Sequence, residues 1–206
     1  QAGTAHFLGQ NFARAFDVKF LDQDNQEKYV WTTSWAVTTR LIGALIMAHG
    51  DDRGLVLPPE IAPYQVVIVP IPGKDGQAVQ RHAAELAARL RQRVRVKLDD
   101  REQYTPGWKF NEWEMHGAPL RLEIGPRDLA RGQVVLARRT GGEKMSVSED
   151  GLVETVERTL QEIQAELLGR ARRFLDEHIS DARSVDEIAA LIEARRGFVR
   201  AGWCQS

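Results

Sequence analysis

The chain is poor in the features that mark several large protein classes. It has a single cysteine, Cys204, so it cannot form a disulfide within itself, which is typical of a reducing compartment such as the cytoplasm. Its longest apolar run, residues 41–48, is too short to span a bilayer, and no signal-peptide pattern opens it. The formal net charge is only −1, so any contact with nucleic acid must use a local cluster of Lys and Arg.

The composition is that of a folded, water-soluble protein. The 206 residues are 43% hydrophobic and 28% charged, and they suffice for one large domain or two small ones. The sequence begins at Gln1, without Met, and enters dense motif-like sequence at once. We therefore expect that the parent protein continues beyond both ends of this chain.

Hydrophobic periodicity predicts an α/β protein. Helical spacing covers residues 9–16, 39–49, 77–93, 108–116, 152–178 and 185–194. Strand patterns cover residues 18–21, 29–34, 65–71, 94–98, 120–124, 133–138 and 144–147, the first two as an antiparallel pair. Pro58 and Pro59 mark a candidate domain boundary. The alternation of strands and helices after Pro63 predicts a mixed five-stranded sheet with helices on its faces.

Two segments near the N-terminus carry residues suited to a nucleotide and a small ring. One holds Thr4 and His6, and the other runs from Ser34 through Trp35 to Arg40. Hydroxyls at a strand end can line a pocket, a buried Trp can form its apolar wall, and an Arg at a helix start can bind a triphosphate. Taken singly, Thr4 could be a helix cap, His6 a structural residue, Trp35 a core residue and Arg40 a surface ion-pair residue.

Residues 1–59 resemble the end of the catalytic domain of class II aminoacyl-tRNA synthetases, specifically the prolyl-tRNA synthetase family. The similar stretches are residues 4–12, 33–35, 38–44 and 49–59. The resemblance implies ATP-binding roles for Gln1, Thr4, Thr38 and Arg40, with Arg40 also catalytic, and proline-binding roles for His6, Ser34 and Trp35. Ala5 and Ala36 depart from the usual Ser and Gly of the family, but neither change removes a proposed ligand.

The implied function is that of a proline–tRNA ligase. Such an enzyme uses ATP and Mg²⁺ to form prolyl-adenylate and then transfers proline to tRNA(Pro), mostly by positioning and charge stabilisation. The family's first two motifs are not in this sequence, so we expect that this chain alone does not activate proline. A non-catalytic tRNA-binding module or paralogue stays open as an alternative, as does a related synthetase for threonine, histidine or glycine.

A second group of residues is suited to reading guanine in single-stranded RNA. Residues 106–117 mix aromatics with charges, and residues 120–128 follow as a strand and turn. Phe110 could stack on a base, Arg121 could donate to guanine O6 and N7, and Glu114 could accept from N1 and N2. The plainer reading places Trp108 and Trp113 in the core and pairs Glu114 with Arg121.

Residues 62–166 resemble the anticodon-binding domain of the same family, and proline anticodons share two guanines. The resemblance therefore implies anticodon contacts for Phe110, Glu114 and Arg121. Residues 197–204 are similar to the run that introduces the first cysteine of a C-terminal zinc-binding domain in archaeal and eukaryotic members. Cys204 would then be a first ligand of Zn²⁺ that only the full-length protein could bind, because a zinc site takes four ligands.

These resemblances predict three parts: residues 1–61 as the end of the catalytic domain, 62–166 as the anticodon-binding domain, and 167–206 as the start of the zinc-binding-like domain. They also imply a homodimer of the full-length enzyme, a cytoplasmic location and no membrane partner.

Overall fold

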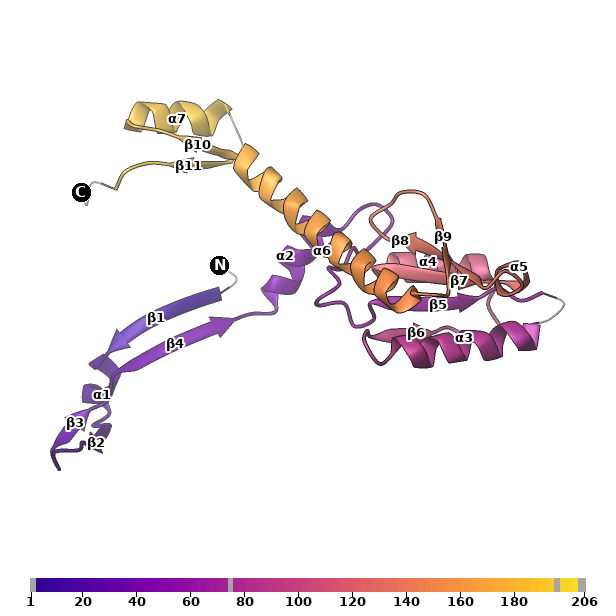
Figure 1. The fold of residues 1–206 in the computed structure, drawn as a ribbon. Helices are drawn as coiled ribbons and strands as arrows, with labels where there is room; N and C mark the ends of the chain where they lie inside the picture. The colour runs from indigo at the N-terminus through magenta and orange to yellow at the C-terminus, as the bar shows by residue number, and fades with distance from the viewer. Residues whose placement is uncertain (1–2, 74–75, 195–196, 204–206) are drawn as a thin grey trace. The chain divides into compact units, whose positions relative to one another are not determined.

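The computed structural model describes residues 3–73, 76–194 and 197–203, and its elements follow one another as labelled in Figure 1. The chain divides into two compact units, residues 1–48 and residues 49–206. In the described ranges, no helix is both long and apolar enough to cross a lipid bilayer.

The first unit consists of two antiparallel ribbons and two helices. Strand β1 (Gly3–Gly9) pairs with β4 (Thr32–Val37), and β2 (Lys19–Leu21) pairs with β3 (Glu27–Tyr29). Helix α1 (Asn11–Ala15) joins the ribbons, and α2 (Arg40–His49) follows β4. In the polar turn between β2 and β3, Asn25 has a φ of 54° and its N–H donates to the carbonyl of Asp22.

The expectation of one strand over residues 29–34 was wrong, because the chain changes partner there. Residues up to Tyr29 pair with β2, and residues from Thr32 onward pair with β1, so Val30 and Trp31 lie between two different ribbons. Aromatic and β-branched residues continue through the break, which is why local propensity could not show it.

The second unit is built on the predicted five-stranded mixed sheet, in the order β6-β5-β7-β8-β9. Strands β6 and β7 run parallel to β5, whereas β8 and β9 are antiparallel to their neighbours. The strands are β5 (Val66–Pro70), β6 (Val96–Leu98), β7 (Leu120–Ile124), β8 (Gln133–Arg138) and β9 (Met145–Ser148). Every residue of β5 is buried, as its unbroken apolar run predicts, while the edge strand β9 alternates between half-buried and exposed positions.

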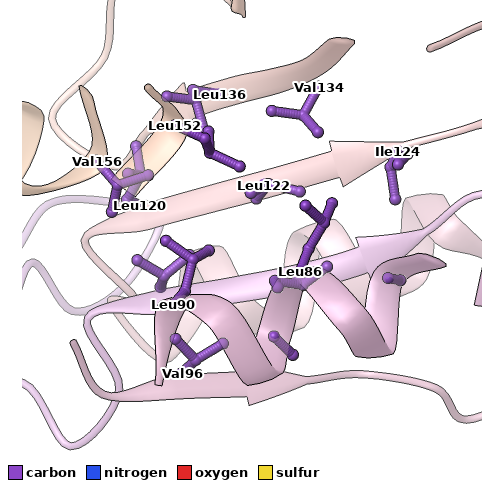
Figure 2. Close-up of a cluster of buried hydrophobic side chains, with 14 of the residues drawn as sticks. Leu86, Leu90, Val96, Leu120, Leu122, Ile124, Val134, Leu136, Leu152 and Val156 are labelled. Atoms are coloured by element: carbon purple, nitrogen blue, oxygen red, sulfur yellow. The ribbon is translucent and has the colours of Figure 1, made fainter. Parts of the chain in front are cut away.

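Helices cover both faces of this sheet. Helix α3 (Gly76–Leu90) and the start of α6 (Leu152–Glu177) pack on the face that carries Leu120 and Leu122. These side chains, with those labelled in Figure 2, form the main core. Helix α4 (Pro106–Met115) covers the other face, where Phe110 and Trp113 pack against Val67 and Val69. The short helix α5 (Pro126–Leu129) connects β7 to β8.

The last described part is a small β-α-β element. Strand β10 (Ile179–Asp181) pairs in parallel with β11 (Phe198–Arg200), and α7 (Val185–Ala194) lies between them in sequence. Helix α6 runs without interruption across residues 166 and 167. The domain boundaries expected at residues 61 and 166 remain predictions. Cys204, the suggested zinc ligand, lies outside the described residues.

Candidate nucleic-acid interface

Helix α4 presents Phe110 and Glu114 on the same side, because residues four apart lie one turn above each other. Thr105 caps the helix by accepting from the N–H of Trp108 at 3.3 Å, and Pro106 follows at its first turn. On strand β7, Leu120 and Leu122 face the main core, so the alternating Arg121 faces α4.

The structure brings Phe110 and Arg121 into contact. The Arg121 guanidinium carbon lies 4.3 Å from the centre of the Phe110 ring, and Nη1 donates to the Phe110 carbonyl at 3.4 Å. Glu114 and Arg121 line one cavity of about 170 Å³, together with cationic residues from three other segments. The three residues suggested as guanine readers therefore belong to one surface.

Glu114 does not pair with Arg121, as the plainer reading proposed. Arg53 contacts Glu114, with 2.6 Å between Nη1 and Oε1. Arg121 instead donates from Nε to Glu123 at 3.0 Å. The side-chain exposure of Glu114 is 25%, so its carboxylate is held at the cavity wall and still reaches solvent.

Lys144 is a functional candidate that the sequence reasoning missed, since it was read only as the first residue of the strand predicted over residues 144–147. Its Nζ lies 2.8 Å from Glu123 and 5.2 Å from the centre of the Phe110 ring. Glu123 is almost fully buried between Lys144 and Arg121, so two cations share one carboxylate beside an aromatic ring. Gly141 and Gly142, at φ of 100° and 96°, form the turn that leads to Lys144.

A buried carboxylate holds α4 on the sheet. Asp99 accepts from Arg101 at 2.8 and 2.7 Å and from Trp113 Nε1 at 2.7 Å, while Lys109 donates to its carbonyl at 3.0 Å. Burial raises the pKa of Asp99, but the hydrogen bonds from Arg101 and Trp113 and the charge of Lys109 outweigh it and lower the pKa to about 2. Because Lys109 and Trp113 both lie on α4, Asp99 holds the helix that carries Phe110 and Glu114.

The two tryptophans of this region have different environments. Trp113 is partly buried against the sheet, as expected of a core residue. Trp108 is 43% exposed and stacks on Tyr104 at 3.9 Å, so its expected place in the core was wrong. The Arg101 guanidinium lies over both rings of this stack.

A larger cavity, of about 720 Å³, lies beside the start of α3 and the loop before α4. Two of its cations, Arg101 and Lys109, are already paired with Asp99, and Arg101 also contacts Glu112. The lining of this cavity has three cationic side chains, Arg81, Arg101 and Lys109, together with Glu102. The lining of the smaller cavity has five cationic side chains together with Glu114: Arg53, Arg121, Arg138, Arg139 and Lys144.

The residues suggested for ATP and proline lie in the first unit. His6 is opposite Ser34 and Thr4 is opposite Ala36 in the β1–β4 ribbon, so His6, Thr4 and Ser34 share one face. Trp35 is opposite Ala5 on the other face and is 82% exposed, rather than buried within this unit. The ribbon thus makes the two motif segments neighbours.

The end of β4 leads directly into helix α2, which begins at Arg40. The Thr38 hydroxyl accepts from the Arg40 N–H at 3.3 Å, at the point where α2 begins. Gln1 lies outside the described residues. The nucleotide and proline roles of these residues remain predictions.

Comparison with known proteins agrees with this geometry. A family model described as "Anticodon binding domain" matches residues 65–159, which include the whole five-stranded sheet and α4. The chain is 54% identical to a protein named proline–tRNA ligase from Natranaerobius thermophilus, over 99% of the chain and 42% of that relative. Proteins of the same name from Cenarchaeum symbiosum and Chloroflexus aurantiacus are each 52% identical, over 99% and 98% of the chain and 43% of each relative. The chain spans less than half the length of the curated relatives it matches.

Proposed function

We propose that the chain is the C-terminal portion of a member of the proline–tRNA ligase family and that it works within a synthetase that charges tRNA(Pro). In this proposal the second unit recognises the anticodon and the first unit contributes part of the ATP and proline site. The observation that carries it is the cavity shared by Glu114 and Arg121 beside the Phe110 ring.

The chemistry of the cavity matches the edges of guanine. The Arg121 guanidinium carries five N–H donors, enough to hold Glu123 and still donate to O6 and N7 of a base. The Glu114 carboxylate accepts hydrogen bonds only, which suits guanine N1 and N2. Adenine offers an acceptor at N1, so it would face the carboxylate with a lone pair. Arg121, Lys144 and Phe110 add charge and stacking that strengthen RNA binding without regard to sequence.

The decisive experiment separates proline activation from tRNA charging in the full-length synthetase. We expect Arg121→Ala to lower kcat/KM for charging of tRNA(Pro) by about 10- to 100-fold, because one base-reading contact is worth roughly 1–3 kcal/mol. Proline-dependent pyrophosphate exchange should stay unchanged. Arg131→Ala, at an exposed arginine in the turn after α5, is the matched control. Equal losses in both assays would contradict an anticodon role for Arg121.

For the first unit, we propose that Thr4, Thr38 and Arg40 bind ATP and that His6, Ser34 and Trp35 bind proline, with Gln1 as a further ATP contact. The support is the β1–β4 register, in which His6 is opposite Ser34, and the hydrogen bond from the Arg40 N–H to Thr38 at the start of α2. Arg40→Ala should abolish most pyrophosphate exchange while tRNA binding persists. Exchange at the wild-type rate would rule out a catalytic role for Arg40.

We propose that the full-length synthetase uses ATP with Mg²⁺, and that any Zn²⁺ site would need ligands in addition to Cys204. Among the described residues, no group of three or more His, Cys, Asp or Glu side chains could hold a metal ion. We therefore assign no Mg²⁺ or Zn²⁺ ligand within the described residues. A homodimer and a cytoplasmic location are further proposals drawn from the family, and light scattering of the full-length enzyme tests the first. A full-length protein that binds tRNA(Pro) but never exchanges pyrophosphate would favour the alternative of a non-catalytic module.

A further inference from the structure

A tight turn at residues 51–54, which precedes the five-stranded sheet, is hydrogen-bonded to the end of helix α4. Asp51 and Gly54 exchange two backbone hydrogen bonds, of 3.1 and 3.0 Å, and the Leu55 N–H donates to the Met115 carbonyl at 2.9 Å. Gly54 has a φ of 124°, and a Cβ there would lie 2.6 Å from the carbonyl oxygen of Met115. The turn therefore has one close-fitting position against the residue that follows Glu114.

A second set of hydrogen bonds holds the same turn through the side chain of Asp51. Arg139, whose side chain is 1% exposed, donates to both carboxylate oxygens of Asp51 at 2.8 and 2.6 Å. Its Nε also donates to the backbone carbonyl of Glu114 at 2.8 Å. The hydrogen bonds from Arg139 hold the pKa of Asp51 well below its usual range. One buried guanidinium thus ties the turn and the backbone of Glu114 together.

This arrangement places the Arg53 side chain beside the Glu114 carboxylate. Arg53 Nη1 lies 2.6 Å from Oε1, and the Arg53 N–H donates to Asp51 at 2.9 Å, so the backbone of Arg53 is fixed as well. The Arg53 side chain is 56% exposed, and exposed ion pairs contribute only about 0–1 kcal/mol to stability. Stability alone therefore explains little of why the turn is held so firmly beside this carboxylate.

We propose that Arg53 is a positioning residue for guanine recognition, because it orients the Glu114 carboxylate toward the Watson–Crick edge of the base. The inference rests on the proposed function of Glu114. A carboxylate has two oxygens with about four acceptor directions, so Arg53 at Oε1 leaves acceptor sites for guanine N1–H and N2–H. Without Arg53, the Glu114 carboxylate can rotate between several side-chain conformations. RNA binding must then order the side chain, and this loss of conformational entropy weakens the affinity for RNA.

The test is charging of tRNA(Pro) by the full-length synthetase, with each of the two shared anticodon guanosines replaced in turn by inosine, which lacks the N2 amino group. In the wild type, we expect the guanosine read by Glu114 to be preferred over inosine by about tenfold or more in kcat/KM. Glu114→Gln should remove most of that preference. Arg53→Gln should lower it by about threefold or more through KM for tRNA, with kcat and pyrophosphate exchange unchanged.

Three further variants make the outcome decisive. Arg93→Gln is the matched control, since Arg93 is 62% exposed and pairs with Glu157 as Arg53 does with Glu114. Arg53→Lys keeps the charge and should restore part of the preference. In the background of Glu114→Gln, Arg53→Gln should cause no further loss of preference.

Each result bears on one of the two claims. If Glu114→Gln leaves the guanosine preference intact at both positions, the proposed role of Glu114 fails and the inference fails with it. If Glu114→Gln abolishes the preference while Arg53→Gln leaves it at the wild-type value, the inference alone is overturned. An equal drop with Arg93→Gln would also overturn it, because the effect would then be general to surface charge.

Discussion

Replacing Asp99 by Asn tests how helix α4, which carries Phe110 and Glu114, is held on the sheet. Asp99 is 1% exposed and receives donors from Arg101 and Trp113, with Lys109 also close by. A pKa of about 2, against an ordinary value of 3.8, means that ionised Asp99 stabilises the fold by about 2 kcal/mol relative to protonated Asp99. Asn keeps the shape but lacks the charge, and it leaves the buried Lys109 without its anion. We therefore expect Asp99→Asn to lower the free energy of unfolding by at least about 2 kcal/mol at pH 7.

The lowered pKa of Asp99 also predicts how the effect of Asp99→Asn on unfolding free energy changes with pH. Because the pKa of Asp99 is lower in the folded state, its stabilisation is fully present above about pH 4 and is lost as the pH falls toward 2. The difference in unfolding free energy between wild type and Asp99→Asn should shrink over that window.

Urea unfolding of the chain, followed by tryptophan fluorescence between pH 2 and pH 7, measures the difference. The exposed neighbour Asp100 provides the matched control, and Asp100→Asn should change the unfolding free energy by less than about 0.5 kcal/mol. Equal stability of Asp99→Asn and wild type at pH 7 would refute the reasoning, as would a difference that stays constant down to pH 2.

Two further predictions concern the core and the catalytic limits of the chain. Leu122→Ala, at a fully buried position of β7, should lower the free energy of unfolding by about 2–5 kcal/mol, whereas Leu168→Ala, at a half-exposed position of α6, should cost much less in the same urea titration. The isolated 206-residue chain should show no proline-dependent pyrophosphate exchange, because the described residues supply only the β1–β4 ribbon and the start of α2 to the proposed activation site. Measurable exchange by the chain alone would contradict that expectation.

Local patterns were sufficient for most elements of the second unit. The bounds of β7, β8 and α7 agree with the strands and helix predicted from residues 120–124, 133–138 and 185–194. The unbroken β-branched run near residue 66 identified the central strand, since only a strand covered on both faces can bury every side chain. The placement of Phe110 and Glu114 on one side of a helix also followed from their spacing.

The partner of each charged group depended on the tertiary structure. Glu114 contacts Arg53 and not Arg121, and Lys144, which begins the strand predicted over residues 144–147, contacts Glu123. These pairs are far apart in sequence, and their distances are set by how separate segments pack around α4.

The sequence alone therefore determined the fold class and most element bounds, because hydrophobic periodicity is a local property. It suggested Phe110, Glu114 and Arg121 as candidates through their side-chain chemistry and the family resemblance. Only the tertiary structure decided that Tyr29 and Thr32 pair with different ribbons, that Trp108 is exposed, and that Asp99 and Arg53 hold the reader residues in place. The physical reason is that hydrogen bonds and ion pairs act over a few ångströms, so their partners are fixed only after distant segments have packed together.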